Sequence, residues 1–397
     1  MMDYSNNSFS QPNIQTQGND SNFISEISEL ENKLVQSSVP VGLKEEAMRN
    51  IVRLKRMAKW GNYSSEFETV DKYVDWITRI PWGVLSQDNL DINNAKMLMD
   101  DSHYGMDTIK NMILDYLASM QLQLHRRVVP SVMPTQYPMG DSVSSNMVEL
   151  KGSSANAPVL LFVGLQGVGK TSIAKSIAKS MNREFARISL GAIGDVRTLR
   201  GTPKQVVDAE PGSLIKALAR CKTMNPVILL DEIEKSSGNS GLLNDVMAAL
   251  LEILDSEQNS SFVDHYIDYP VDLSKVFFIC TANNLGGLSA ALLDRVEVIR
   301  FTSYSDDEKE VIAKQYILPK ALKNLNLTIE DIKITDEVWP LIIRPVGFDA
   351  GIRQLERNIA TLIRSAARLI VEGHPVPIIV NNQNLSQFVL PDQGPLS

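Results

Sequence analysis

Residues 159–171 constrain the fold more than any other stretch of the sequence, and they read VLLFVGLQGVGKT. The apolar run predicts a buried strand, and the glycines after it let the backbone curl so that successive N–H groups point at phosphate oxygens. A lysine and a hydroxyl at the end of such a loop bind the β- and γ-phosphates and Mg²⁺, respectively. We therefore predict a site for a nucleoside triphosphate, with Thr171 as a Mg²⁺ ligand, on the loop residues Gly164, Leu165, Gln166, Gly167, Val168, Gly169, Lys170 and Thr171.

The context of this loop makes the prediction specific. Residues 171–179 alternate apolar and polar side chains at helical spacing, which places a helix N-terminus under the phosphates, where its dipole favours anions. A strand before the loop and a helix after it favour phosphate binding over an ordinary glycine turn, which is the alternative interpretation of the same residues.

A second stretch supplies carboxylates for the same site. Residues 226–232 read PVILLDE, a short apolar strand that ends in Asp231 and Glu232. Because phosphoryl transfer depends on placed charge, we predict that Asp231 holds Mg²⁺ and that Glu232 polarises the attacking water. The alternative is that both acids only cap the next helix.

Two further apolar stretches predict strands, at 185–190 and at 276–280. The second one ends in residues 281–283, which place the amide of Asn283 where ligands bind in doubly wound sheets. Strands thus alternate with helical patterns. We therefore predict an α/β fold, with a parallel sheet and helices on both faces.

The composition excludes several other classes of protein. The chain has 397 residues, 44% of them hydrophobic and 22% charged, as in soluble globular proteins of two or three domains. A net charge of −8 argues against a general polyanion binder, so we do not expect nucleic acid as a partner. Two cysteines and four dispersed histidines provide neither a disulfide framework nor a zinc site. The first positive charge is Lys33 and no apolar run reaches membrane-spanning length, so we expect no leader, no membrane contact and a cytoplasmic protein.

The patterns divide the chain into five segments. Residues 1–23 are rich in Asn, Ser and Gln and predict a disordered tail, and residues 24–93 predict a helical N-terminal extension. Residues 94–303 hold the nucleotide-binding α/β domain, with an insertion at about 122–157 in which no period persists. Residues 304–390 predict a small helical lid domain, and residues 391–397 a tail.

Apolar residues at helical spacing predict a helical hairpin in the extension, broken at 37–42. A third helix is predicted from Glu66 to Arg79. The second helix has a polar face that is either solvated or binds a partner, and this face is basic: Lys44, Arg49, Arg53, Lys55, Arg56 and Lys59.

With these segments in place, the chain resembles the ATPase portion of Lon proteases, within the AAA+ superfamily. The resemblance runs from about Ile24 to about Leu390, outside the tail and the insertion. It rests on several motifs together: YVDW and IPW at 73–76 and 80–82, HYG at 103–105, the phosphate loop, LLEILD at 250–255 with EQN at 257–259, DHY at 264–266, LLDR at 292–295 and GIR at 351–353.

The resemblance implies further roles by position. Tyr104 and Gly105 are expected in the adenine pocket, and Asn283 as the sensor that orients the attacking water beside the second carboxylate. Arg353 corresponds to the lid arginine that senses loss of the γ-phosphate, and Arg295 to the arginine finger. Arginine fingers of this family act on the neighbouring subunit, which implies a ring, with a hexamer expected. The alternative for Arg295 is an ordinary surface ion pair.

Departures from the family pattern bear on function. Family members have two prolines where this chain has Leu165 and Gln166, and because backbone N–H groups contact the phosphates, we expect binding to persist. Residues 205–212 read QVVDAEPG, so Val206 stands where the family has the aromatic residue that grips a threaded polypeptide. The sequence ends at Ser397, and we expect neither the proteolytic domain nor the globular N-terminal domain of the family in this chain.

The sequence therefore predicts a Lon-type AAA+ ATPase module that binds ATP and Mg²⁺ and acts on protein substrates. It would be the ATPase component of ATP-dependent proteolysis, with its peptidase on a separate chain or missing, or a protein unfoldase. The alternatives are a non-proteolytic remodeller and a regulatory subunit. The expected assembly is a homo-oligomeric ring or a mixed ring with a Lon-like protease. A nucleic-acid motor is the least favoured reading of the phosphate loop.

Overall fold

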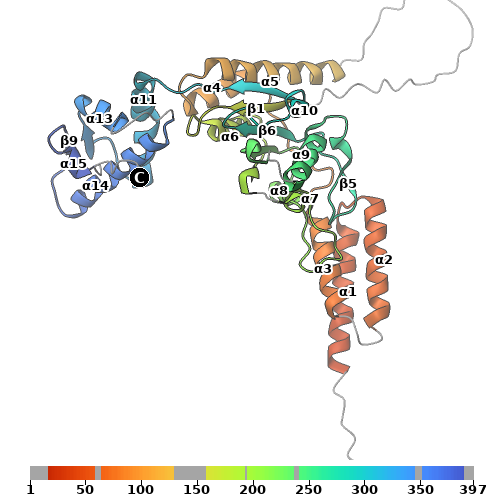
Figure 1. Ribbon diagram of the computed structural model, residues 1–397. Helices are drawn as coiled ribbons and strands as arrows, with labels where there is room; N and C mark the ends of the chain where they lie inside the picture. The colour runs from red at the N-terminus through yellow and green to blue at the C-terminus, as the bar shows by residue number, and fades with distance from the viewer. Residues whose placement is uncertain are drawn as a thin grey trace, which may run out of the picture.

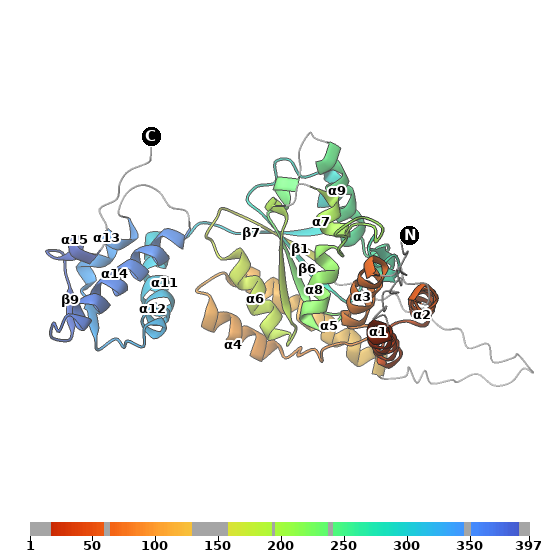
Figure 2. The ribbon, with the colours of Figure 1, turned by 90° about the horizontal axis from the view of Figure 1, so that it is seen from below.

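The computed structural model describes residues 17–58, 64–128, 158–192, 195–236, 241–344 and 351–388. These residues form a helical extension, an α/β core and a small lid. Figures 1 and 2 show the extension and the lid on opposite sides of the core. The predicted α/β fold class is confirmed.

The extension is built from α1 (Gln17–Gln36), α2 (Val41–Ala58) and α3 (Ser64–Arg79). Each helix presents aliphatic side chains at helical spacing to a common core, in which Leu34 and Ile77 are fully buried. Helix α3 ends before Pro81, because proline disfavours helical geometry in the residue that precedes it. Helix α1 begins at Gln17, so the prediction of a disordered tail was wrong for residues 17–23, while residues 1–16 lie outside the described chain.

The core begins with a pair of helices, α4 (Ile92–Ser102) and α5 (Asp107–Val128). Asp91 caps α4, because its carboxylate accepts hydrogen bonds from the backbone N–H groups of Asn93 and Asn94. Helix α5 continues through residues 122–128, where an irregular insertion was predicted to begin. That boundary was wrong, since residues 121–127 are mostly good helix formers. The rest of the predicted insertion, residues 129–157, lies outside the described chain.

The core sheet is parallel, with five strands in the order β2-β3-β6-β1-β7. Its strands are β1 (Val159–Val163), β2 (Phe185–Ser189), β3 (Val227–Asp231), β6 (Phe277–Ala282) and β7 (Val296–Arg300). The three central strands are buried along their whole length, as their apolar sequences predicted. Edge strand β7 was not predicted, because Glu297 and Arg300 interrupt its apolar pattern. Since the strands are parallel, the carboxyl ends of β1, β3 and β6 meet at one edge, where the phosphate loop begins.

Alternate side chains of each strand enter apolar cores on the two faces of the sheet. Leu160 and Phe162 of β1 pack with α4, α5 and α6 (Lys170–Ser180). Leu161 and Val163 point to the other face, which packs against α8 (Ser213–Cys221), α9 (Gly241–Leu254) and the helical extension. Figure 1 shows α4 and α5 on one side of the sheet and α8 and α9 on the other.

Short elements complete the core: η1 (Leu190–Ala192), α7 (Val196–Arg200), η2 (Ile233–Ser236), η3 (Asn259–Ser261), the antiparallel pair β4 (Phe262–Val263) and β5 (Pro270–Val271), and α10 (Ala290–Leu293). A buried carboxylate, Asp264, joins two of the loops between them. It accepts hydrogen bonds from the backbone N–H groups of Gly212, Tyr266 and Ile267, at 2.7, 2.9 and 3.2 Å. Burial nevertheless raises the pKa of Asp264 to about 6.

The lid contains α11 (Asp306–Ile312), the π-helical turn η4 (Ala313–Ile317), α12 (Leu318–Asn324), η5 (Asp336–Val338), α13 (Trp339–Ile343), α14 (Arg353–Val371) and α15 (Leu385–Phe388). Ser305 and Glu308 form a capping box that starts α11. Strand β8 (Ile332–Ile334) pairs in parallel with β9 (Ile378–Val380). Strand β8 was not predicted, because a strand this short carries too little pattern to be recognised.

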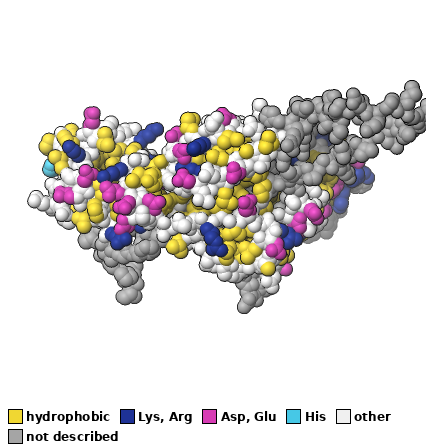
Figure 3. Space-filling view, turned by 90° about the horizontal axis from the view of Figure 1, so that it is seen from above, with side chains coloured by type: hydrophobic (Ala, Val, Ile, Leu, Met, Phe, Trp, Pro, Cys, Tyr) yellow, Lys and Arg dark blue, Asp and Glu magenta, His cyan; other side chains and the backbone are white. Residues whose placement is uncertain are grey.

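The surface carries charges of both signs. On the face seen in Figure 3, basic and acidic side chains are interspersed over the core and the lid. Among the described residues, none of the helices has the length and apolar character needed to cross a membrane.

Candidate nucleotide site

The phosphate loop lies between the end of β1 and the start of α6. The N–H group of Gly164 donates to the carbonyl of Ala282 at 3.2 Å, which joins the loop to the end of β6. A Cβ atom on Gly164 would lie 2.7 Å from the carbonyl oxygen of Phe301, so the backbone can pass there only as glycine. Gly167 (φ 85°) and Gly169 (φ 101°) adopt positive φ angles that turn backbone N–H groups inward at the N-terminus of α6.

A cavity of about 200 Å³ lies over this loop, between the core and the start of α14 in the lid. It brings together most of the residues predicted from the sequence: Gln166, Gly167, Gly169, Lys170, Thr171, Asp231, Glu232, Asn283 and Arg353. The rest of its lining comes from Ser172, Arg187, Thr281, Ile352 and Glu356. The two predicted halves of the site and the lid arginine therefore face one space.

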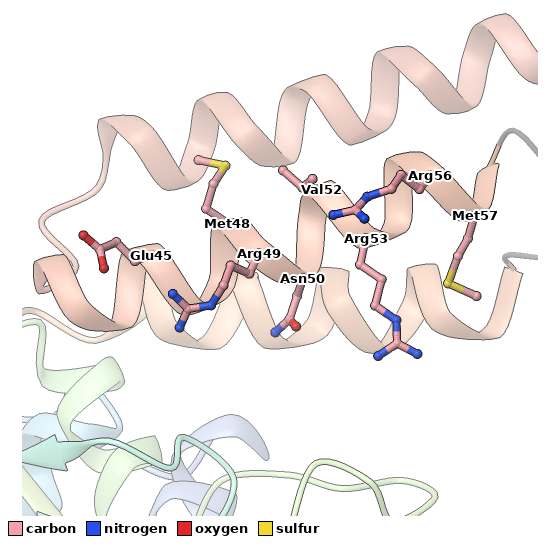
Figure 4. A pocket seen from close by; sticks show the side chains of 8 residues that line it. All are labelled: Glu45, Met48, Arg49, Asn50, Val52, Arg53, Arg56 and Met57. Carbon is pink, nitrogen blue, oxygen red and sulfur yellow. The ribbon is translucent and has the colours of Figure 1, made fainter.

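A larger hollow, of about 810 Å³, lies in the helical extension (Figure 4). Its lining residues all belong to α2 and combine arginines with apolar side chains: Glu45, Met48, Arg49, Asn50, Val52, Arg53, Arg56 and Met57. None of the predicted nucleotide residues lines it, so its size does not identify it as the nucleotide site. Partner binding by the basic face of α2 stays a prediction.

Lys170 is 9% exposed, and its ammonium group is turned back onto the loop. It donates to the carbonyl oxygens of Gly164 and Leu165, the latter at 3.1 Å, and to Oδ1 of Asn283 at 3.1 Å. Burial lowers the pKa of Lys170, although the nearby carboxylates oppose this shift. A buried ammonium group bound to neutral acceptors gains stronger, charged acceptors when phosphate oxygens enter the cavity.

The two predicted acids have separate partners. Asp231 accepts a hydrogen bond from the hydroxyl of Thr281 and forms an ion pair with Arg187, whose Nε lies 2.8 Å from Oδ2. Glu232 accepts from Nζ of Lys235 at 2.7 Å. Within the described chain, neither carboxylate accepts a hydrogen bond from the N–H groups of η2, so the geometry gives no support to the alternative that they only cap the next helix.

Asn283 lies at the end of β6, where its amide contacts a third carboxylate. It donates to Oε1 of Glu234 at 2.7 Å, and it lines the same cavity as Glu232. Its role in orienting the attacking water stays a prediction. The other oxygen of Glu234, Oε2, is buried and has no hydrogen-bond partner in the described chain.

The lid contacts the loop directly through the start of α14. The N–H group of Ile352 donates to the carbonyl of Gly167 at 3.1 Å, and Gly351 is packed against the backbone of Gln166 and Gly167. The next residue, Arg353, lines the cavity and lies close enough to influence the pKa of Lys170. Lid position and loop geometry are therefore linked through adjacent residues of one segment.

The turn that holds Tyr104 and Gly105 lies between α4 and α5 and does not line the cavity. Tyr104 packs against the apolar core of the lid. His103 fixes the turn to α6, because its Nε2 lies 2.8 Å from Oγ of Ser172, in the first turn after the loop. Burial, assisted by the charge of Lys110, lowers the pKa of His103 to about 4. A role of this turn in adenine binding stays a prediction.

Arg295 lies away from the cavity of its own chain. Its Nε and one terminal nitrogen are both 3.2 Å from Oδ2 of Asp255, and its other terminal nitrogen donates to the carbonyl of Ala291 at 2.8 Å. The side chain is about one-third exposed. Within one chain, Arg295 thus forms the surface ion pair given above as the alternative, and its action on a neighbouring subunit stays a prediction.

The residues around Asp231 fit a Mg²⁺ ion that is held together with phosphate groups. Carboxylate, hydroxyl and water oxygens are the ligands that Mg²⁺ prefers, and it keeps several waters while binding one or two protein groups. Asp231 and Thr171 line the same cavity and offer a carboxylate and a hydroxyl oxygen. In the described part of the chain, no three His, Cys, Asp or Glu residues form a metal cluster.

Sequence reasoning missed Arg187, Glu234 and Lys235, although each contacts a predicted residue. A charged residue at the centre of a five-residue edge strand was the available signal for Arg187. Glu234 and Lys235 follow the predicted acids directly, but which of them reaches which partner depends on the turn of η2. That turn begins after Glu232, which itself has a positive φ of 62°.

Comparison with known proteins places this geometry in a family. Residues 160–304 match the ATPase family associated with various cellular activities (AAA), and residues 323–378 match the Lon protease AAA+ ATPase lid domain. The chain is 39% identical over 366 residues to Lon protease 2 of Thermus thermophilus, which covers 92% of this chain and 43% of the relative. It is 39% identical over 360 residues to the mitochondrial Lon protease homolog of Drosophila melanogaster, which covers 91% of this chain and 31% of the relative.

The chain thus spans less than half the length of these curated relatives. The residues that match the AAA model hold the phosphate loop and nearly the whole parallel sheet, and those that match the Lon lid model lie in the lid. The chain therefore belongs to the AAA+ ATPases and contains the ATPase core and lid of the Lon protease family.

Proposed function

We propose that this chain is a Mg²⁺-dependent ATPase whose hydrolysis cycle acts on protein substrates. The observation that carries the proposal is the convergence of Lys170, Asp231, Glu232 and Arg353 on one cavity over the phosphate loop. The curated relatives are named Lon proteases, and the chain matches the part of them that holds the ATPase core and lid.

The residues of the cavity have different roles in phosphoryl transfer. Backbone N–H groups of the loop and the ammonium group of Lys170 bind the phosphates, and positive charge there stabilises the transition state. Glu232 accepts a proton from the attacking water, and Asn283 supplies a polar amide beside it. When bound by Asp231 and Thr171, Mg²⁺ would neutralise the charge that develops on the β- and γ-phosphate oxygens.

Steady-state phosphate release by the wild-type chain and by Glu232→Gln tests the ATPase proposal. Glu232→Gln should bind ATP but hydrolyse it at least ~10²-fold more slowly, because it lacks the proton acceptor. Chelation of Mg²⁺ should stop turnover by the wild type. Wild-type turnover no faster than that of Glu232→Gln, under conditions in which both bind ATP, would refute the proposal.

We also propose that the active form is a ring, a hexamer in its simplest form, in which Arg295 completes the site of the neighbouring subunit. Its exposed position away from its own cavity supports this role, since a finger must reach across an interface. Co-expression of two inactive variants, Lys170→Ala and Arg295→Ala, tests it. Mixed rings contain interfaces at which an intact Lys170 meets an intact Arg295, so activity should return. Co-purified mixed oligomers without activity would contradict the role.

One observation favours a second candidate function, protein remodelling without ordinary threading. Val206 and Val207, at the tip of the loop between α7 and α8, are 51% and 86% exposed, and no aromatic side chain accompanies them. Nζ of Lys204 lies 2.8 Å from Oε1 of Glu46 and 4.7 Å from the centre of the Tyr73 ring, which attaches this loop to the helical extension. A small aliphatic tip on an attached loop gives a weaker grip than a mobile aromatic one. A role as a regulatory subunit in mixed rings with a Lon-like protease stays a prediction. A cytoplasmic location also stays a prediction.

A further inference from the structure

Glu232, the proton acceptor of the proposed reaction, occupies a constrained position. Its backbone has a φ of 62°, which is rare for a residue other than glycine and is typical of functional sites. Its N–H group donates to Oγ1 of Thr281 at 3.0 Å, so the backbone is fixed to strand β6. The direction in which the side chain leaves the backbone is thereby set.

The carboxylate of Glu232 is fixed at its far end by Lys235. Nζ of Lys235 donates to Oε2 at 2.7 Å, across the first turn of η2. This hydrogen bond is the largest cause of a raised pKa at Lys235. Oε1 takes no part in the pair, so one oxygen is anchored and the other is available to a water molecule in the cavity.

Gly191, in η1 after strand β2, forms the surface against which this pair rests. A Cβ atom at Gly191 would lie 2.6 Å from Oε2 of Glu232 and 2.9 Å from Cδ of Lys235. These distances are well inside van der Waals contact, which is about 3.5–4.0 Å for carbon atoms. Any larger residue at 191 would therefore displace both side chains of the pair.

Resting on the proposed ATPase function, we propose that Lys235 is a positioning residue that orients the carboxylate of Glu232 for proton transfer, with Gly191 as its support. A catalytic base is commonly held in turn by a third group that binds its other heteroatom. Asp231 has different partners, Thr281 and Arg187, and its proposed role is to bind Mg²⁺. The competing interpretation is an ordinary exposed ion pair, since Lys235 is about half exposed, and such pairs contribute little to stability.

The test compares kcat, KM and the dissociation constant of a fluorescent ATP analogue among variants of the full chain. Lys235→Met should lower kcat about fivefold, the rate equivalent of a well-placed exposed pair, with KM and nucleotide affinity within about twofold. Lys235→Arg should recover most of the loss, because it restores a donor to Oε2. Gly191→Ala should also lower kcat, because it displaces the Glu232 and Lys235 side chains while both charges remain.

Two controls separate orientation from other effects. In a Glu232→Gln background, Lys235→Met should change nothing further, since there is no carboxylate to orient. Lys55→Met removes a lysine–glutamate pair, to Glu31, in the helical extension far from the cavity, and should leave kcat unchanged. Thermal unfolding followed by circular dichroism identifies any variant that fails to fold.

The outcomes are distinguishable from failure of the proposed function. If the wild type hydrolyses ATP faster than Glu232→Gln while Lys235→Met and Gly191→Ala both keep its kcat, the orienting role is refuted and the ATPase proposal stands. A faster Lys235→Met variant would also overturn the orienting role, because the pair would then restrain the carboxylate. Equal, negligible turnover of the wild type and Glu232→Gln would instead refute the ATPase function.

Discussion

Replacement of Gly351 by alanine should separate the lid from the phosphate loop. A Cβ atom at this position would lie 2.5 Å from the carbonyl oxygen of Gln166 and 2.8 Å from both Cα and the carbonyl carbon of Gly167. All three neighbours are backbone atoms, so no side chain can rotate away to make room. The lid or the loop must move instead.

The required movement follows from these distances. Carbon atoms pack at about 3.5–4.0 Å, so a separation of 2.8 Å falls short by roughly 0.7–1.2 Å. The loop N–H groups and Arg353, which begins α14, lie on the two sides of this contact. A displacement near 1 Å at a catalytic geometry commonly costs about 10²-fold in rate, so we expect a fall in kcat of about 10- to 100-fold.

Steady-state ATPase assays and thermal unfolding of Gly351→Ala provide the measurement. Gly42→Ala is the matched control, because a Cβ atom at Gly42 meets nothing closer than 3.6 Å and that position is helical. It should leave turnover unchanged and should raise stability by at most about 1 kcal/mol. If Gly351→Ala and Gly42→Ala both turned over ATP like the wild type, the direct link between lid and loop would be wrong.

Two further predictions concern pH and the loop tip. The pKa of His103 is about 4 in the folded chain and 6.5 in the unfolded chain, so the unfolded chain binds more protons between these pH values. Lowering the pH from 7.5 to 5 should therefore reduce the unfolding free energy of the wild type by roughly 2 kcal/mol more than that of His103→Gln. Urea titrations of both chains at the two pH values measure this difference. The variant is needed as a reference because the pKa of Asp264 is raised to about 6, so protonation of Asp264 increases stability over an overlapping pH range. Equal pH dependence of the two chains would contradict the prediction. Lys204→Met should reduce the protection of residues 205–209 from amide hydrogen exchange, because it releases the loop from Glu46 and Tyr73, and unchanged protection would show that this contact does not hold the loop.

The parts of the fold that were predictable are those in which local pattern and tertiary position agree. The strands β1, β3 and β6 are central in the sheet, so their whole sequences are apolar, and the motif that follows β1 fixes a helix after it. The strand β7 lies at an edge and carries Glu297 and Arg300, so it lacks the continuous apolar run by which the central strands were predicted. The pairing of β8 with β9 joins residues 332–334 to 378–380, and neither local pattern contains that information.

In the site, too, the residues of the motifs were predictable from the sequence and their hydrogen-bond partners were not. The identities of Lys170, Asp231 and Glu232 follow from spacing alone, because the chemistry of phosphate binding requires those residue types after a strand. The partner of each group does not follow from spacing. Asn283 binds Glu234 and Glu232 binds Lys235, because the positive φ of Glu232 and the turn of η2 decide where successive side chains point.

The central claim is that the cavity over the phosphate loop binds ATP between core and lid, and a structure of Glu232→Gln determined with Mg²⁺ and ATP tests it most directly. We predict that the phosphates lie on the N–H groups of residues 167–171 and that Nζ of Lys170 leaves the carbonyls of Gly164 and Leu165 to bind them. Arg353 should approach the terminal phosphate from the start of α14. An empty cavity at saturating ATP, with Lys170 still bound to the loop carbonyls, would contradict the account.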